Sequence, residues 1–127
     1  VPLAARWAVD VVRRFSQTVA EQLAAAHPDR FVARSGEAHR VGRIFVDYLR
    51  NGEGATAVAA YSLRARPGLG VAMPVAWEAL DEVGSATEWS IASALDHLAS
   101  RRADPWAELD ASKQSLAGPL KALGLQP

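Results

Sequence analysis

The sequence contains no cysteine, no apolar run long enough to cross a bilayer, and no net charge. Without thiols the chain can form neither disulfide bonds nor thiolate metal sites, which fits a reducing compartment. The short apolar runs predict no membrane segment, and no positively charged stretch followed by an apolar one opens the chain as a signal peptide would. We therefore expect a cytoplasmic protein that has no membrane partner.

Size and composition favour a single domain with a real core. The chain has 127 residues, of which 50% are hydrophobic, and this length corresponds to about one domain. It begins with Val1 instead of methionine, and the opening "VPL" resembles the last turn of a strand whose beginning is missing. We expect a processed terminus, a non-standard start or a shortened fragment.

The charge is zero only on average, because basic and acidic residues are separated along the chain. Seven arginines lie from Arg30 to Arg66, whereas eight acids lie from Glu78 to Asp110. This pattern predicts one basic and one acidic region. The planar fork of arginine suits bidentate binding of phosphate. A GC-rich coding bias would explain the arginines equally well.

Apolar periodicity predicts a long helix over residues 5–27, because apolar residues recur there every four positions. Pro28 forces its predecessor out of helical geometry and ends the helix. The apolar stripe comprises Trp7, Val11, Phe15, Val19 and Leu23. The elements expected next are a strand at 31–34, a polar loop at 35–42, a strand at 43–50, a hairpin turn at 51–54 and a return strand at 55–63.

The second half of the sequence predicts less regular structure. Proline and glycines prevent regular secondary structure over residues 64–70. Residues 71–77 are expected to be extended at best, and residues 77–83 to form a short helical turn. A helix is expected over 90–102, capped by Ser90, and a last helix over 112–123 is limited by a proline. The helix at 90–102 should bury its apolar stripe, Ile91, Leu95 and Leu98. The fold class predicted is α+β, with an antiparallel β-hairpin or sheet core flanked by helices.

Asp47 stands out because it places a carboxylate in the middle of the apolar run "RIFVDYLRN". On a strand, Phe45, Asp47 and Leu49 would share one face. From spacing alone, an aspartate here is more often a strand-end residue or the ion-pair partner of a nearby arginine than a catalytic group. Both interpretations remain open at this point.

The stretch "RVGRIFVDYLRNGEGATAVAAYSLRARPGLGVAMPVAWEALDEV" closely resembles the polymerase domain of bacterial DNA ligase D. That domain belongs to the archaeo-eukaryotic primase superfamily and serves non-homologous end joining. The segments "VPL", "HPDRFVARS", "RADPW" and "KQSLAGPLKALG" look like other parts of the same domain in the same order. The resemblance thus covers residues 1–127, which would be the C-terminal part of the domain with a partial primase-polymerase fold.

The resemblance implies roles for four residues. Asp47 would be the third acid of the family's metal-binding triad, serving as a catalytic ligand of Mn²⁺ or Mg²⁺ in two-metal nucleotidyl transfer. Arg40 and Arg64 would reach the phosphates of the nucleotide, and Arg66 is a weaker candidate for the same patch. The family's paired aspartates, and the serine and histidine of its second motif, have no counterpart in this chain. We therefore expect the isolated chain to be inactive, since one carboxylate cannot hold two divalent ions.

Three functional hypotheses follow from the resemblance. The chain is part of an enzyme that adds nucleotides to DNA ends or gaps, a non-catalytic module that binds a DNA end or a nucleotide, or a residual fold with an exposed sheet edge. The partners implied are DNA ends, nucleoside triphosphates, and a missing N-terminal half or ligase domain.

The histidines and tryptophans carry weaker indications of function. His39 has no second histidine at ligand spacing, so metal binding by histidine is not expected. The tryptophans could stack on bases, but we expect them to pack in the core. They are Trp7, Trp77, Trp89 and Trp106.

Overall fold

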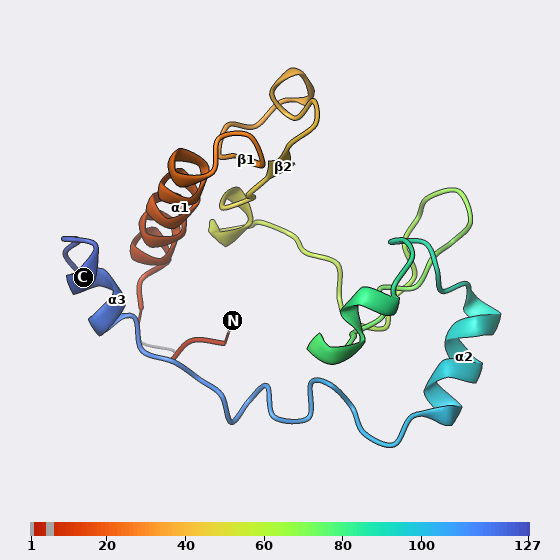
Figure 1. Cartoon of the computed structure of the whole chain (residues 1–127). Coiled ribbons are helices and arrows are strands. Elements are labelled where there is room, and N and C mark those ends of the chain that lie inside the picture. Colours follow the sequence, from red (N-terminus) through yellow and green to blue (C-terminus); the bar gives the residue numbers. More distant parts are fainter. Residues whose placement is uncertain (1, 5–6) are drawn as a thin grey trace. The chain divides into compact units, whose positions relative to one another are not determined.

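The computed structural model describes residues 2–4 and 7–127, and Figure 1 shows its elements in chain order. The polypeptide divides into two compact units. The first unit comprises the residues up to Thr56 together with Lys113–Pro127, and the second unit comprises Ala57–Ser112. Val1 and the first two positions of the helix predicted at 5–27 lie outside the described residues.

The long N-terminal helix is confirmed as α1, Val9–Ala26. It ends two residues before Pro28. His27 leaves helical geometry with φ −136° and ψ 64°, while its N–H still donates to the Leu23 carbonyl. The apolar face of this helix predicted from the sequence is only partly buried. Val11 is buried and Phe15 packs partly against the same cluster, but Val19 is exposed.

The core of the first unit joins α1 to the end of the chain. Val11, Leu116 and Leu120 form the buried cluster, and Leu120 is only 1% exposed. Leu120 lies on α3, Ala117–Ala122, which is shorter than the helix predicted at 112–123. Pro119 is tolerated because the N–H groups of a first helical turn have no partner within the helix. Partly buried side chains that pack against the cluster are Leu3, Trp7, Val12, Phe15 and Leu125.

The start of the chain is held beside the segment that precedes α3. Leu3 and Gln114 form an isolated parallel bridge, in which the Ala4 N–H donates to the Gln114 carbonyl and the Gln114 N–H to that of Pro2. Extended backbone at "VPL" thus pairs, but with a segment more than a hundred residues later. Arg14 adds a second link, since its guanidinium donates to the Gln126 carbonyl over 2.6 Å.

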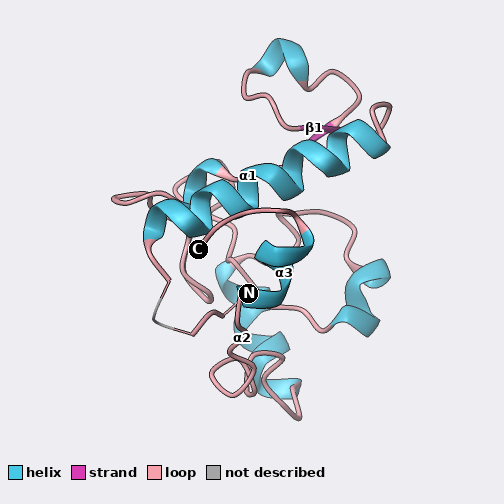
Figure 2. Cartoon of the chain, turned by 90° about the vertical axis from the view of Figure 1, so that its left-hand side faces the viewer, coloured by secondary structure: helices cyan, strands magenta, loops and turns pink. Residues whose placement is uncertain are grey.

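The α+β class is confirmed, although the sheet is small and its strands run parallel. Strand β1, Phe31–Val32, pairs with β2, Ile44–Phe45, in the register Phe31 to Ile44 and Val32 to Phe45. Figure 2 shows how little of the chain is strand. The expected pairing of 43–50 with 55–63 as an antiparallel hairpin was wrong.

The backbone hydrogen bonds explain why the predicted hairpin does not form. The Ile44 N–H donates to the Arg30 carbonyl over 2.8 Å and the Val46 N–H to that of Val32 over 3.0 Å. The next polar group, the carboxylate of Asp47, accepts the Leu49 N–H and turns the chain into the short helix η2, Leu49–Asn51. Aspartate often ends regular structure by such local bonding.

The second unit contains two helical elements and little core. The turn predicted at 77–83 is confirmed as η3, Trp77–Glu82, and the helix predicted at 90–102 as α2, Ile91–Ser100. Ser90 caps α2 in a capping box with Ser93, as its residue type predicts. Within the described residues, every helix is too short or too polar to cross a membrane.

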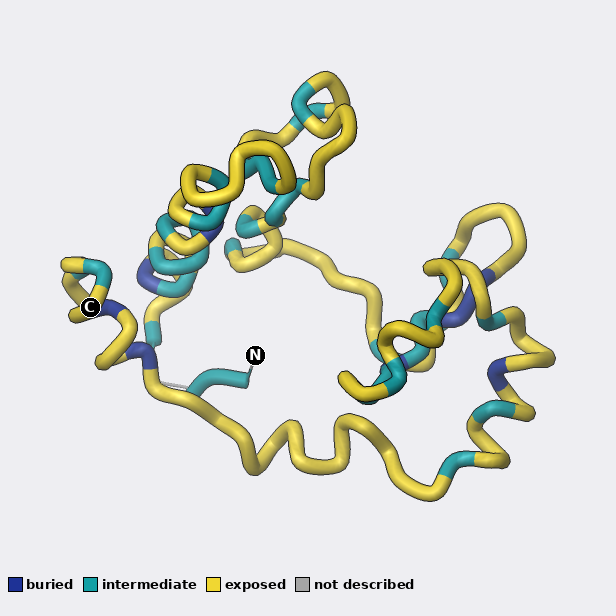
Figure 3. The backbone as a smooth tube through the Cα atoms, in the orientation of Figure 1, coloured by how far each residue is buried: buried dark blue, intermediate teal, exposed yellow. Residues whose placement is uncertain are grey.

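The predicted burial of the α2 stripe was wrong. Ile91 and Leu95 are 48% and 63% exposed, Leu98 is also exposed, and the buried residue of this helix is Ala94. Figure 3 shows α2 as largely exposed. An amphipathic pattern predicts which face is apolar, but a neighbouring element must be present to cover that face.

Replacing Leu120 by alanine tests the core of the first unit. Because the side chain is almost fully enclosed, Leu120→Ala should lower the free energy of unfolding by about 2–4 kcal/mol, as cavity-forming changes do. Urea unfolding followed by far-ultraviolet circular dichroism measures this. The control Leu95→Ala removes the same atoms from an exposed position of α2 and should change the free energy by less than about 0.5 kcal/mol. Equal effects of the two changes would contradict the placement of the core.

Candidate functional site

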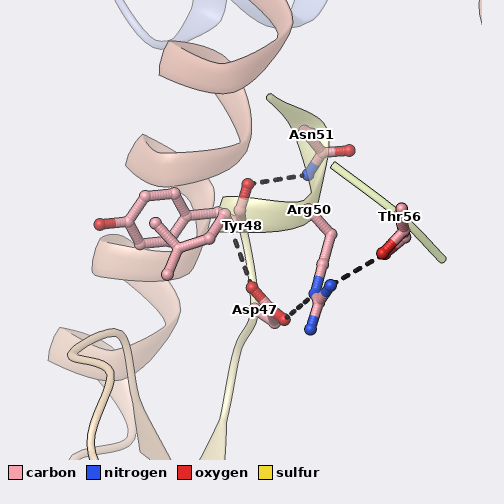
Figure 4. Close-up of polar contacts among 6 residues, drawn as sticks. Asp47, Tyr48, Arg50, Asn51 and Thr56 are labelled. Carbon is pink, nitrogen blue, oxygen red and sulfur yellow. Dashed lines mark hydrogen bonds and ion pairs between the residues drawn. The ribbon is translucent and has the colours of Figure 1, made fainter. Parts of the chain in front are cut away.

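Asp47 lies between β2 and η2, at the point where the backbone turns. One carboxylate oxygen, Oδ1, accepts the Leu49 N–H over 3.0 Å, and the other, Oδ2, lies 3.5 Å from Nε of Arg50. The Asp47 side chain keeps 38% of its surface exposed. Figure 4 shows this carboxylate between the turn and the guanidinium. Its orientation is therefore fixed from both sides while it remains open to solvent.

Arg50 joins Asp47 to the segment that follows η2. Its Nη1 donates to the Thr56 carbonyl over 2.9 Å, and the amide of Asn51 donates to the Tyr48 carbonyl over 3.2 Å. The ion pair is exposed, so its stabilising contribution is small, typically below about 1 kcal/mol. The sequence left open that Asp47 pairs with a nearby arginine, and in the structure that arginine is Arg50. The i, i+3 spacing within a helical turn was the feature that could have indicated this pairing.

Asp47 and Arg40 line the same recess of the first unit. The recess has a volume of about 370 Å³, and its wall includes Phe45 and Arg50. The Arg40 guanidinium lies 5.4 Å from the centre of the Phe45 ring, an arrangement that favours a cation over an aromatic face. The structure thus brings together two of the residues selected from the sequence, one anionic and one cationic.

A glycine shapes the loop that carries Arg40. Arg40 directly follows the short helix η1, Glu37–His39, and its Nε donates to the Gly36 carbonyl over 3.4 Å. Gly36 has φ 122°, a conformation that side chains rarely adopt, and a Cβ there would come within 3.2 Å of the His39 ring. The loop predicted at 35–42 therefore contains a helical turn whose entry requires glycine.

Arg64 and Arg66 lie in the second unit. Arg64 is half-buried and lines an apolar recess of about 330 Å³ together with Met73, Trp89 and Trp106. Arg66 is exposed, on the loop that follows. Of the arginines selected from the sequence, Arg64 is thus the one that lies in an apolar recess.

The part of the chain that the structure describes does not form a complete site for two metal ions. It holds no group of three or more histidine, aspartate or glutamate side chains that could bind a metal. Asp47 is the single carboxylate that lines its recess, and Arg50 already pairs with it. A pair of divalent cations needs several oxygen ligands of negative charge. The residues present therefore fit one ligand of such a site and not the whole site.

The expectation that the tryptophans pack in the core holds for only part of the set. Trp7 packs against the cluster of the first unit and Trp89 is half-buried. Trp77 is 86% exposed and Trp106 is 47% exposed. Core packing was the wrong prediction for these two, because the second unit has too little buried volume to enclose large rings.

Comparison with known proteins identifies the class and then the family. The fold matches the polymerase domain of Mycobacterium tuberculosis ligase D, solved in complex with DNA, with a TM-score of 0.76 and 30% identity over 89% of this chain and 39% of that one. Residues 1–106 match the family described as "LigD, primase-polymerase domain". The chain therefore belongs to the primase-polymerase domain family of the end-joining repair protein LigD.

Individual relatives agree with this assignment. The chain is 46% identical over 124 residues to the multifunctional non-homologous end joining protein LigD of Pseudomonas aeruginosa. The matched residues make up 95% of this chain and 14% of that protein. The corresponding protein of Mycolicibacterium smegmatis is 36% identical over 77 residues, or 61% of this chain and 10% of that protein. The family predicted from the sequence is confirmed, and the chain spans a small part of these relatives.

The incomplete ligand set predicts weak binding of metal by the isolated chain. Because Asp47 offers one carboxylate, Mn²⁺ should not saturate the site below about 1 mM, the weak end of carboxylate-based sites. Paramagnetic broadening of the amide resonances near Asp47 measures this, with Asp47→Asn as the test variant and Glu37→Gln as its control. Saturation at micromolar Mn²⁺ that is abolished by Asp47→Asn would show that another copy of the chain supplies further ligands.

Proposed function

We propose that this chain supplies one metal-binding carboxylate and several phosphate-binding arginines to the active site of an end-joining polymerase. That enzyme would add nucleotides to DNA ends or gaps by nucleotidyl transfer with Mn²⁺ or Mg²⁺. The observation that carries the proposal is the shared recess of Asp47 and Arg40 in a member of the LigD primase-polymerase family. The isolated chain would be inactive.

Asp47 is suited to be one ligand among several. Its carboxylate is held by the Leu49 N–H, which fixes the direction of the remaining oxygen lone pairs. The guanidinium of Arg50 balances its charge while no cation is bound. The further carboxylates would come from polypeptide outside this chain, in keeping with the 39% of the solved ligase D polymerase domain that the chain covers.

Arg40 is suited to bind phosphate beside that carboxylate. It is exposed at the recess, and its contact with the Phe45 ring limits its rotamers without neutralising its charge. A pre-positioned guanidinium offsets the charge of a triphosphate and the charge that develops in the transition state. Arg64 and Arg66 would offer guanidinium groups of the second unit to phosphate.

A second candidate function is binding without chemistry. The observation that favours it is the imbalance within the recess that Asp47 lines, where two arginines, Arg40 and Arg50, accompany a single carboxylate. The related Mycobacterium tuberculosis domain was solved in complex with DNA. Under this alternative, the chain would bind a DNA end or a nucleotide and leave catalysis to another polypeptide.

Both candidate functions predict that the isolated chain is inactive, and a primer-extension assay tests this. With a primed DNA, nucleoside triphosphates and Mn²⁺, the isolated chain should give no extended product, because one carboxylate cannot hold two cations. Gel analysis of a labelled primer measures this, with Glu53→Ala as a control for loss of an acid near the site. Extension that survives Glu53→Ala and disappears in Asp47→Ala would contradict the expected inactivity.

DNA binding by the arginines should depend steeply on salt. Arg40→Ala combined with Arg64→Ala should weaken binding and reduce the slope of log K against log salt by about 2, one for each lost phosphate contact. Fluorescence anisotropy of a labelled DNA end between low and moderate salt measures the slope. Arg13→Ala combined with Arg102→Ala removes the same charge from two exposed positions elsewhere in the chain and should change the slope less. Equal slopes in the two double variants would exclude a specific role for Arg40 and Arg64.

A further inference from the structure

A polar cluster in the second unit has no role in the function proposed above. The hydroxyl of Tyr61 donates to Oδ1 of Asp104 over 2.6 Å, although the two residues lie 43 positions apart. Arg101 donates to the same hydroxyl from Nη1 over 3.2 Å and to the Pro74 carbonyl from Nη2. Its guanidinium also lies 5.9 Å from the centre of the Tyr61 ring. One tyrosine side chain is thus held by a carboxylate and a guanidinium.

The backbone of Tyr61 is in a conformation that needs such support. Its φ is 61°, in the left-handed region that residues other than glycine rarely occupy. Residues in such regions persist only where the surrounding contacts over-determine them, and they cluster at functional sites. The Tyr61 N–H donates to the Ala72 carbonyl over 2.8 Å, so both backbone and side chain are anchored.

The anchored residue begins the short hairpin that carries Arg64. The Ala72 N–H donates back to the Ser62 carbonyl over 2.9 Å, and the Arg64 N–H donates to that of Gly70 over 2.9 Å. Between these bonds, Leu63 and Val71 form an antiparallel bridge. The geometry at Tyr61 therefore sets the start of the strand-like segment on which Arg64 lies three residues later.

Asp104 also bonds to the backbone of a second residue of the recess that Arg64 lines. Its Oδ1 accepts the Trp106 N–H over 2.9 Å in addition to the Tyr61 hydroxyl. Trp106 and Arg64 both line that recess. One carboxylate oxygen thus connects Tyr61, three residues before Arg64, to the backbone of Trp106.

The protonation states favour this arrangement over a wide pH range. The hydrogen bond from Tyr61, followed by that from the Trp106 N–H, lowers the pKa of the Asp104 carboxyl below its usual value. Burial, followed by the bond to Asp104, raises the pKa of the Tyr61 hydroxyl above its usual value. Asp104 is therefore ionised and Tyr61 protonated at neutral pH, which is the pairing that their hydrogen bond requires.

We propose that Tyr61, Arg101 and Asp104 form a clamp that positions Arg64 for binding the phosphates of a nucleotide. The three are positioning residues, since none of them is placed in contact with the nucleotide. This inference rests on the proposed function for the role of Arg64, but the clamp itself makes a separate structural claim about the hairpin of residues 61–72.

Amide hydrogen exchange tests the structural claim directly. Tyr61→Phe removes only the hydroxyl, and it should raise the exchange rates of the Arg64 and Ala72 amides by about tenfold, the scale of one lost hydrogen bond. The amides of α2 should be unaffected, which separates loss of the clamp from general unfolding. Tyr48→Phe is the matched control, because it makes the same change at the chain's other tyrosine, in the first unit. Unchanged exchange at both hairpin amides in Tyr61→Phe would overturn the clamp.

Triphosphate binding tests whether the clamp acts through Arg64. Inorganic triphosphate binding should weaken by about threefold to tenfold in Tyr61→Phe and by no further factor when Tyr61→Phe is added to Arg64→Ala. Added to Arg40→Ala, Tyr61→Phe should still weaken binding. A purely structural role would give the same loss in every background and would overturn the positioning role.

The two measurements distinguish failure of this inference from failure of the proposed function. If the unmodified chain binds no triphosphate, the phosphate-binding role of Arg64 fails, and positioning for phosphate fails with it, while hydrogen exchange still decides whether the clamp orders the hairpin. If triphosphate binds and Tyr61→Phe leaves the affinity unchanged, the proposed function stands and the positioning role is overturned.

Discussion

The hydrogen bond from the Leu49 N–H to the Asp47 carboxylate decides the structure around the candidate site. It stops β2 after two residues, starts η2 and directs the second carboxylate oxygen toward Arg50. A longer strand would alternate its side chains between two faces and would leave the backbone of this segment in a sheet. The turn instead leaves Asp47 lining the recess that Arg40 also lines. The position of the acid is thus a consequence of its own local hydrogen bonding.

The pairing of Asp47 with Arg50 shows how a lone carboxylate is accommodated. Two or three acids placed together repel one another unless a cation is present, whereas one acid can be balanced by one arginine. In the described residues, Asp47 has only this arginine as an ion-pair partner. Membership of the LigD primase-polymerase family and an incomplete ligand set are consistent if the site is shared with polypeptide outside this chain.

Some elements were predictable because they depend on neighbours in the sequence. The apolar period of α1 and the cap at Ser90 act within a few residues, and both are observed. The strand predicted at 43–50 failed because its apolar pattern was outweighed by the side-chain bond of Asp47. The stripe of α2 was identified correctly as apolar, but its burial depends on an element that must pack over it, and periodicity alone cannot supply that information.

The candidate site, like the fold, was predicted only in part from the sequence. The sequence singled out Asp47 and Arg40, which share a recess, but it did not assign Arg50 as the partner of the acid. The bond between Tyr61 and Asp104 had no sequence indication, because it joins residues 43 positions apart through one hydroxyl. Long-range polar contacts of this kind follow from the tertiary structure and leave no periodic pattern in the sequence.

A chimeric enzyme tests most directly whether Asp47 is one ligand of a shared metal site. This chain would replace the matching segment of the Pseudomonas aeruginosa LigD polymerase region, to which it is 46% identical over 124 residues. The measurement is Mn²⁺-dependent primer extension by the chimera with Asp47 or with Asp47→Asn. We expect extension by the first and a loss of at least about a hundredfold in the second, as for removal of a group that stabilises transition-state charge. Equal extension by both would contradict the assignment of Asp47 as a metal ligand.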